Sequence, residues 1–189
     1  MGKIVLVTGG ARSGKSTFAE RLFMKLSPQG GIYVATAEAH DEEMKERIRL
    51  HQASREASGY AWSTVNQSLE LPSWLSEEEQ PTVLVDCLTI WLSNELLRAE
   101  QEDEGRMEAQ LECRIRDILD ALQCIQQRDG VVVMVTNEVG SGVVPAYKLG
   151  RVFRDAAGRL NQRIAALADE VYLVTAGIPI ELKSRMVEL

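Results

Sequence analysis

Short apolar runs alternate with amphipathic stretches along the whole chain. The apolar runs predict strands at residues 3–8, 32–37, 61–65, 82–87, 131–136 and 170–175. The amphipathic stretches predict helices at residues 13–26, 41–55, 68–80 (a short one, interrupted at Pro72), 88–100, 106–128 and 149–168. Several strands are continuous apolar runs, which is typical of strands buried on both faces. The pattern therefore predicts one α/β domain over residues 1–189, with a mainly parallel sheet between two layers of helices.

Polar and glycine-rich segments follow four of the predicted strands. They lie at residues 8–16, 35–40, 86–89 and 136–142, and residues 101–105 form a further, acidic segment that we expect to be a solvated loop. Right-handed crossovers place the carboxyl ends of parallel strands at one edge of a sheet, where ligands of such sheets bind. We expect the four segments to gather at that edge.

Composition and charge narrow the classes of protein to consider. The 189-residue chain is 45% hydrophobic and 26% charged, which is typical of a globular protein. Its net charge of −7 argues against a nucleic-acid-binding protein, because such proteins are usually basic. No apolar stretch approaches the ~20 residues of a membrane helix, and the first apolar run is too short for a signal peptide. We therefore expect a cytoplasmic protein without membrane insertion.

The three cysteines, Cys87, Cys113 and Cys124, lack the spacing of a metal site. We expect reduced thiols that are buried or half-buried.

The segment after the first predicted strand carries a specific chemical signal. Residues 9–16, GGARSGKS, match G-x-x-x-x-G-K-[ST] between a predicted strand and a predicted helix. The glycines let backbone N–H groups surround an anion, and the helix adds its positive N-terminus. Lys15 is then expected to reach the terminal phosphates of a nucleotide, and Ser16 to bind Mg²⁺. The motif predicts a three-layer α/β/α fold of the P-loop NTPase type.

Asp86 ends the apolar strand at residues 82–87. A carboxylate at that place is suited to hold Mg²⁺ together with Ser16. The alternative is that Asp86 caps the helix that follows.

The predicted helix at residues 41–55 places an imidazole between two guanidinium groups. At 100° per residue, one face within about 100° of arc carries Met44, Arg47, Ile48, His51 and Arg55. Arginines are suited to bind phosphates, and a neutral imidazole is suited to act as a nucleophile. The spacing alone leaves open that His51 is a partly buried structural histidine. His40, in the loop before this helix, carries a weaker signal.

Taken together, these motifs resemble those of the adenosylcobinamide kinase/adenosylcobinamide-phosphate guanylyltransferases of cobalamin synthesis. The resemblance runs from residues 4–16 to residues 169–174. It includes YVATA at 33–37, the histidine helix at 41–51, VTNEVGSGVVP at 135–145 and RVFRDAAGRLNQR at 151–163. The last two segments are more specific than the phosphate loop alone.

The resemblance implies an activity and a set of site residues. It implies phosphorylation of adenosylcobinamide by a nucleoside triphosphate, ATP or GTP, and then transfer of GMP from GTP through a histidine, which aligns with His51. It also implies Mg²⁺, a corrinoid substrate and a homotrimer. The implied nucleotide contacts are Gly9, Gly10, Ala11, Arg12, Ser13, Gly14, Lys15, Ser16, Ala35, Thr36, Ala37, Gln52, Ala53, Ser54, Arg55 and Asp86.

Two further hypotheses remain at this point. The first is a simple small-molecule kinase in which His51 is structural. The second is a regulatory or assembly NTPase, although the guanine motif N-K-x-D of switch GTPases is absent from TNEVG. In that segment, Asn137 or Glu138 is suited to orient a water, a metal or a substrate hydroxyl, or else forms a turn before the next helix.

Overall fold

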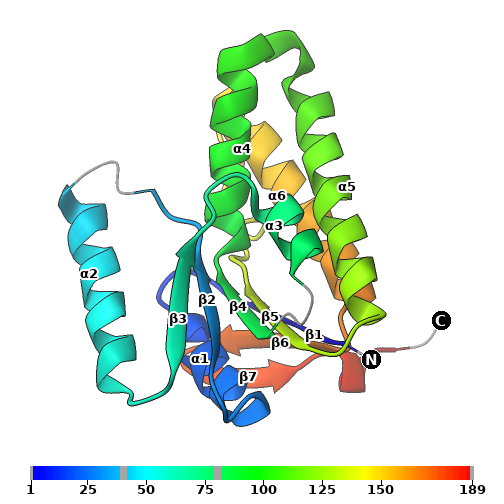
Figure 1. Ribbon diagram of the computed structural model, residues 1–189. Helices are drawn as coiled ribbons and strands as arrows, with labels where there is room; N and C mark the ends of the chain where they lie inside the picture. Colours follow the sequence, from blue (N-terminus) through cyan, green and yellow to red (C-terminus); the bar gives the residue numbers. More distant parts are fainter. Residues whose placement is uncertain (1, 39–41, 79–81, 188–189) are drawn as a thin grey trace.

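The computed structural model describes residues 2–38, 42–78 and 82–187, and its elements alternate as the sequence predicts (Figure 1). The strands are β1 Lys3–Thr8, β2 Gly31–Ala35, β3 Trp62–Asn66, β4 Thr82–Asp86, β5 Val131–Val135, β6 Glu170–Thr175 and β7 Ile178–Glu181. The helices are α1 Lys15–Leu26, α2 Glu42–Ala57, α3 Leu71–Glu77, α4 Leu88–Asp103, α5 Met107–Gln126 and α6 Lys148–Leu167, with 3₁₀ turns η1 Glu104–Arg106 and η2 Lys183–Arg185.

The strands form one sheet in the order β3-β2-β4-β5-β1-β6-β7 within the described residues. Every neighbouring pair is parallel except β6 and β7, which pair antiparallel. Strand β5 lies between β1 and β4, so the segment after β5 lies between the phosphate loop and the end of β4. The predicted mainly parallel α/β fold is confirmed.

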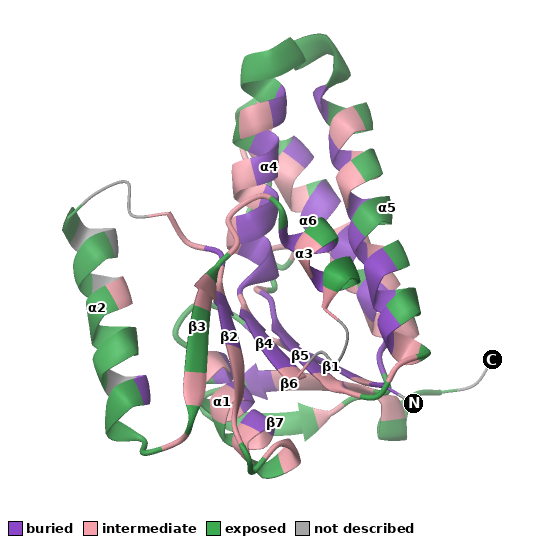
Figure 2. Ribbon diagram, in the orientation of Figure 1, coloured by how far each residue is buried: buried purple, intermediate pink, exposed green. Residues whose placement is uncertain are grey.

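The central strands are buried on both faces of the sheet, which explains their continuous apolar runs, whereas β3 and β7 at the sheet edges are largely exposed (Figure 2). Alternate strand residues enter two different clusters. Ile4 and Leu6 of β1 pack with α3, α4, α5 and α6, whereas Val5 and Val7 pack with Phe23 of α1. Helix α2 lies beside β3 and covers less of the sheet (Figure 1).

Two details of the helices differ from the sequence prediction. Helix α4 continues to Asp103 and η1 follows at once, so residues 101–105 are not a loop. The Asp103 carboxylate caps η1 by accepting from the Gly105 N–H at 2.9 Å. Helix α3 begins at Leu71 with Pro72 in its first turn, where proline fits a helix without interrupting it.

The cysteines also differ in part. Cys87 is buried, but Cys113 and Cys124 are exposed on α5, and all three are free thiols. The prediction of buried or half-buried thiols was therefore wrong for these two, because both lie on the solvent side of an amphipathic helix.

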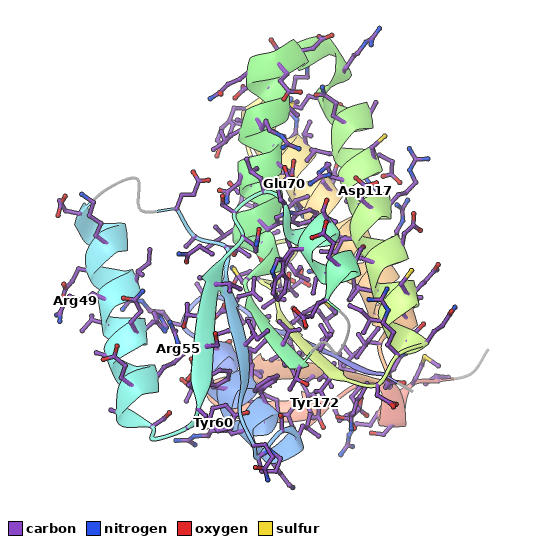
Figure 3. The ribbon with its side chains drawn as sticks, viewed as in Figure 1. Arg49, Arg55, Tyr60, Glu70, Asp117 and Tyr172 are labelled. Carbon is purple, nitrogen blue, oxygen red and sulfur yellow. The ribbon has the colours of Figure 1, made fainter. Side chains whose placement is uncertain are left out.

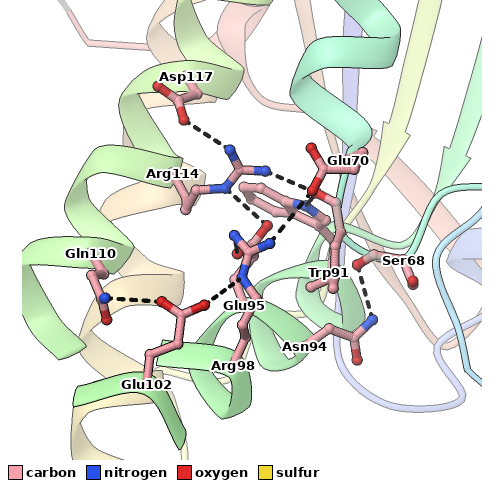
Figure 4. Close-up of polar contacts among 11 residues, drawn as sticks. Ser68, Glu70, Trp91, Asn94, Glu95, Arg98, Glu102, Gln110, Arg114 and Asp117 are labelled. Carbon is pink, nitrogen blue, oxygen red and sulfur yellow. Dashed lines mark hydrogen bonds and ion pairs between the residues drawn. The ribbon is translucent and has the colours of Figure 1, made fainter. Parts of the chain in front are cut away.

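A polar network joins α4 to α5 and to the loop between β3 and α3 (Figure 4). Glu95 of α4 is almost fully buried and accepts hydrogen bonds from Arg98 at 2.6 Å and Arg114 at 2.9 Å. Burial raises the pKa of Glu95, and the charge of Arg114 opposes that rise. Arg114 also donates to the Leu69 carbonyl at 3.0 Å. The network fixes the helical layer behind the carboxyl edge of the sheet.

Candidate functional site

A cleft of about 340 Å³ opens at the carboxyl edge of the sheet. This volume is in the usual range for a small-molecule site. Its lining residues come from α1, β2, α2, β4, α4 and the segment after β5. They are Lys15, Ser16, Tyr33, Ala35, Ala37, Ile48, His51, Gln52, Arg55, Asp86, Cys87, Ile90 and Asn137. The structure thus brings Lys15 and Ser16 of the phosphate loop, Asp86, and Ile48, His51 and Arg55 of the predicted histidine face to one cleft.

The phosphate loop has the backbone geometry that its glycines predict. Gly9 and Gly14 have φ angles of 157° and 91°, and Arg12 also has a positive φ of 56°. A Cβ atom on Gly9 would lie 2.4 Å from the Val174 carbonyl oxygen, so a side chain is excluded there. Lys15, only 9% exposed, donates to the Gly10 carbonyl at 3.1 Å. The loop therefore folds back so that its Gly10 carbonyl contacts the Lys15 ammonium.

Two other segments brace the loop from outside. The Glu138 N–H, after β5, donates to the Gly9 carbonyl at 3.1 Å. The Gly177 N–H, in the turn between β6 and β7, donates to the Ser13 carbonyl at 2.8 Å. Both bonds occupy carbonyl groups on the outside of the loop.

Asp86 leaves the end of β4 on the α1 side of the sheet. Its Oδ2 accepts a hydrogen bond from the Tyr33 hydroxyl at 3.0 Å. Burial of Tyr33, and then the nearby Asp86 charge, raise the pKa of the phenol well above its ordinary value. The phenol therefore stays protonated and donates to the carboxylate at neutral pH.

The cleft offers Ser16 and Asp86 as oxygen ligands for a cation. The described residues contain no group of three or more His, Cys, Asp or Glu side chains placed to hold a metal. One hydroxyl and one carboxylate fit Mg²⁺, which keeps several waters and binds substrate phosphates rather than an all-protein cage.

Helix α2 carries His51, Gln52 and Arg55 into the cleft. His51 is solvent-exposed, whereas Arg55 is only 5% exposed and stacks on the Tyr33 ring, with its Cζ 3.6 Å from the ring centroid. Figure 3 shows Arg55 pointing from α2 toward the sheet, while Arg49 points away. Ala53 is exposed and lies outside the cleft lining.

Four residues named in the sequence prediction concern parts outside the described structure. They are His40 and the side chains of Met44, Arg47 and Ser54.

The segment after β2 is divided between the cleft and the core. Ala35 and Ala37 line the cleft. The side chain of Thr36 is fully buried, where its hydroxyl donates to the Cys87 carbonyl at 2.8 Å and accepts from the Cys87 N–H at 2.9 Å. Thr36 therefore holds the chain after Asp86, and its side chain does not reach the cleft.

Hydrogen bonds fix the backbone of Asn137. Its N–H donates to the Thr89 hydroxyl at 2.7 Å, and its carbonyl accepts from the Asn161 amide at 3.2 Å. The buried Thr136 hydroxyl joins these two, with Asn161 Oδ1 at 2.8 Å and Thr89 Oγ1 at 3.2 Å. Strand β5, α4 and α6 thus fix Asn137 at the cleft. The sequence alone had left open whether this residue forms a turn or has a functional role.

Four other residues line the cleft although the sequence did not predict that they would. They are Tyr33, Ile48, Cys87 and Ile90. Tyr33 lies within YVATA, but the contacts that place its ring and hydroxyl come from α2 and β4 and give no local signal.

Comparison with known proteins identifies the family. Residues 5–182 match the family described as cobinamide kinase / cobinamide phosphate guanyltransferase. The chain belongs to this family. The predicted family is confirmed, and with it the class of bifunctional kinase and guanylyltransferase of cobalamin biosynthesis.

Relatives match over nearly their whole length. The chain is 41% identical over 188 residues to the bifunctional adenosylcobalamin biosynthesis protein CobU of Salmonella typhimurium, covering 95% of this chain and 99% of that one. It is 40% identical over 183 residues to the CobP protein of the same description from Pseudomonas aeruginosa, with 94% and 96% covered. Among solved structures, a KaiC-like protein of Pyrococcus horikoshii is 15% identical, with a TM-score of 0.42 over 90% of this chain and 70% of that chain.

No helix in the described part of the chain is long and apolar enough to span a membrane.

Proposed function

We propose that this cobinamide kinase / cobinamide phosphate guanyltransferase performs its two reactions in the one cleft, and that His51 carries GMP between substrates. The first reaction moves a terminal phosphate to the hydroxyl of adenosylcobinamide. The second moves GMP from GTP to that phosphate. The observation that carries the proposal is that Lys15, Asp86 and His51 line the same cleft although they come from three separate segments.

The phosphate loop is the proposed binding site for the nucleotide's phosphates. Its N–H groups and the N-terminus of α1 provide an anion site, and Lys15 adds a positive charge where negative charge develops during transfer. The Ser13 hydroxyl is buried without a hydrogen-bond partner in the described residues. Buried hydroxyls are normally satisfied, so a bound phosphate oxygen is a suitable partner for it.

Ser16 and Asp86 are the proposed Mg²⁺ ligands. When bound, Mg²⁺ neutralises phosphate charge during transfer. Tyr33 holds the Asp86 carboxylate in one orientation, and β5 places Asn137 between the phosphate loop and Asp86. We propose that the Asn137 amide orients a phosphate oxygen or the substrate hydroxyl.

His51 is the proposed nucleophile. A ring nitrogen attacks the α-phosphorus of GTP, forms a P–N bond, and breaks the P–O bond to pyrophosphate, which leaves. An oxygen of adenosylcobinamide phosphate then attacks the same phosphorus and breaks the P–N bond, giving adenosylcobinamide-GDP. A covalent intermediate divides one difficult transfer into two displacements.

The predicted nucleotide contacts of Gln52 and Arg55 fit this arrangement. Both side chains line the cleft next to His51. Arg55 Nη1 is buried without a hydrogen-bond partner in the described residues, and a guanidinium N–H is suited to donate to a phosphate or ribose oxygen.

Four wider properties belong to the same proposal. We propose that the protein is cytoplasmic, as its sequence predicts, and that it forms a homotrimer and binds a corrinoid, as the family resemblance implies. ATP and GTP are its proposed phosphate donors for the kinase step.

Incubation with α-labelled GTP and Mg²⁺, followed by intact-protein mass measurement, tests the proposal. We expect one GMP per chain in a linkage that acid cleaves and alkali spares, as a phosphoramidate requires. Absence of any label from correctly folded protein would refute the covalent route through His51.

A further inference from the structure

Tyr33 of β2 makes two specific contacts on opposite sides of the site. The face of its ring carries the Arg55 guanidinium, with 3.6 Å between Cζ and the ring centroid. Its hydroxyl donates to Asp86 Oδ2 at 3.0 Å. The side chain itself is only 5% exposed. One buried residue thus touches both the helix that carries His51 and the carboxylate at the end of β4.

The ring of Tyr33 is held in place by neighbouring aromatic side chains. Trp62 of β3 meets it edge to face, with centroids 5.9 Å apart and an interplanar angle of 90°. Trp62 in turn stacks on Phe23 of α1 at 5.1 Å. These contacts come from β3 and α1, so the ring is a fixed surface rather than a mobile side chain.

Arg55 is the main attachment of α2 to this surface. Among the α2 side chains that the structure describes, Arg55 is buried, Ile48 is half-buried, and the rest, His51 included, are exposed. His51 precedes Arg55 by four residues, so both side chains lie on one face of the helix. Fixing Arg55 therefore sets the side of α2 that faces the cleft.

The hydroxyl of Tyr33 acts on the other half of the site. Tyr33 and Ala35 point to the same side of β2, and Ala35 pairs with Asp86 in the sheet. The hydroxyl thus reaches a carboxylate on the neighbouring strand and fixes its orientation. A phenylalanine would supply the same ring to Arg55 but could not hold Asp86.

We propose that Tyr33 is a positioning residue that aligns the two halves of the site, its ring seating α2 so that His51 faces the cleft and its hydroxyl orienting Asp86. The proposal rests on the proposed function for the roles of His51 and Asp86. The two contacts predict separable effects. Loss of the ring impairs GMP transfer to His51, whereas loss of the hydroxyl impairs every step that uses Asp86.

Two substitutions separate the contacts. Tyr33→Phe keeps the ring under Arg55 and removes the hydroxyl, and Tyr33→Leu removes both. Tyr60→Leu is the matched control, because Tyr60 packs on Trp62 at 4.7 Å in the same aromatic cluster but has no hydrogen bond or ring contact with Arg55 or Asp86 among the described residues.

Hydrogen exchange of the nucleotide-free protein tests the seating of α2 independently of activity. In Tyr33→Leu we expect the amides of residues 42–57 to exchange about tenfold faster than in the wild type, because a desolvated cation–π contact is lost. In Tyr33→Phe and Tyr60→Leu we expect their exchange within about twofold of wild type. Unchanged exchange of this segment in Tyr33→Leu would overturn the seating role, whether or not the enzyme reacts with GTP.

Single-turnover rates test the coupling to chemistry. Relative to Tyr33→Phe, we expect Tyr33→Leu to form guanylylated protein about tenfold more slowly while its kinase rate stays within about twofold. Equal guanylylation rates in the two variants would contradict the role of the ring.

Binding of Mg²⁺ tests the role of the hydroxyl. With a non-hydrolysable GTP analogue present, calorimetry should show about tenfold weaker Mg²⁺ binding in both Tyr33 variants, since losing a partner of a metal ligand weakens metal affinity. Wild-type affinity in Tyr33→Phe would overturn that role. Wild-type protein that never accepts GMP would instead refute the proposed function, and the exchange result would still decide the seating of α2.

Discussion

At the scale of single residues, Lys15 follows β1, Asp86 ends β4, and Asn137 follows β5, the strand that lies between those two. The phosphate loop, the carboxylate and the amide therefore meet at neighbouring strand ends without any contact that is local in sequence. The Lys15 ammonium donates to the Gly10 carbonyl, and the Asp86 carboxylate accepts from the Tyr33 hydroxyl. Asn137 is held by its backbone N–H, which donates to Thr89, and its side chain lines the cleft.

Lys15 is expected to be needed for both reactions and unnecessary for folding. In Lys15→Ala we expect kinase and guanylyltransferase rates to fall by about 100-fold or more, because a preorganised positive charge on the phosphates is lost. Circular dichroism and thermal unfolding should match wild type, since Lys15 lies at the start of α1 and lines the cleft rather than the hydrophobic core. Normal turnover by the folded variant would refute the phosphate-site assignment.

The thiols offer a test of burial at the cleft. Burial of Cys87, and then the charge of Asp86, raise its thiol pKa to about 11, so the reactive thiolate is scarce at neutral pH. With iodoacetamide at pH 7.5 we expect peptide mapping to find Cys113 and Cys124 alkylated and Cys87 protected until the protein is unfolded. Alkylation of Cys87 in the native protein at the rate of the other two would contradict its placement.

At the scale of elements, the sequence was sufficient where an element is long or buried and insufficient where it is short or polar. The apolar runs of β1, β4 and β5 and the amphipathic stripe of α5 predicted their elements well. Strand β7 was missed because it has four residues, contains Pro179 and is largely exposed at the sheet edge. The end of α4 was taken for a loop because its last residues, Gln101, Glu102 and Asp103, are exposed and carry no apolar periodicity.

The residues of the site also differ in how well the sequence predicted them. The phosphate loop is a contiguous motif, so its residues were found from the sequence. The position of Tyr33 and the buried hydrogen bonds that hold Asn137 depend on side chains from different strands and helices. No local spacing in the sequence reveals them. The placement of Thr36 in the core, rather than in the cleft, has the same origin.

Asn94 of α4 is expected to stabilise the segment after β2, which borders the cleft, and the loop between β3 and α3 (Figure 4). Its amide donates to the Thr36 carbonyl at 2.9 Å and the Ser68 carbonyl at 3.1 Å. In Asn94→Ala we expect the free energy of unfolding to fall by about 1–2 kcal/mol, because two carbonyl groups lose their donor. Urea denaturation measures this change.

The control for Asn94 is Gln110→Ala. Gln110 donates to Glu102 at the exposed end of the same helical layer, at 3.2 Å. Its loss should change stability by less than about 0.5 kcal/mol. Equal stability changes in the two variants would contradict the tethering role of Asn94.

At the scale of the whole molecule, the C-terminal hairpin closes the sheet beside the phosphate loop. Glu181 of β7 fixes the turn that follows, and accepts from the N–H groups of Ser184, Lys183 and Val171 at 2.6, 2.9 and 3.1 Å. The turn between β6 and β7 reaches the phosphate loop through Gly177. The active cleft thus depends on chain segments from both ends of the protein.

The pH dependence of stability should report this hairpin. Hydrogen bonds from Ser184, followed by those from the other backbone groups, lower the pKa of Glu181 from 4.5 to about 2. A lowered folded-state pKa contributes stability above pH 4.5 that is lost as the pH falls toward 2. We expect Glu181→Gln to unfold at lower urea than wild type at pH 7, with the difference shrinking between pH 4.5 and 3. A difference that stays constant over this range would contradict the assignment.

The most direct test of the account compares the two reactions in His51→Ala. Phosphoryl transfer to a hydroxyl depends on positioning and charge neutralisation, which Lys15, Ser16 and Asp86 still supply, so kinase activity on adenosylcobinamide should remain measurable. GMP transfer needs the imidazole, so the variant should neither acquire label from α-labelled GTP nor form adenosylcobinamide-GDP. A His51→Ala protein that still forms adenosylcobinamide-GDP at the wild-type rate would contradict the central claim that His51 carries GMP.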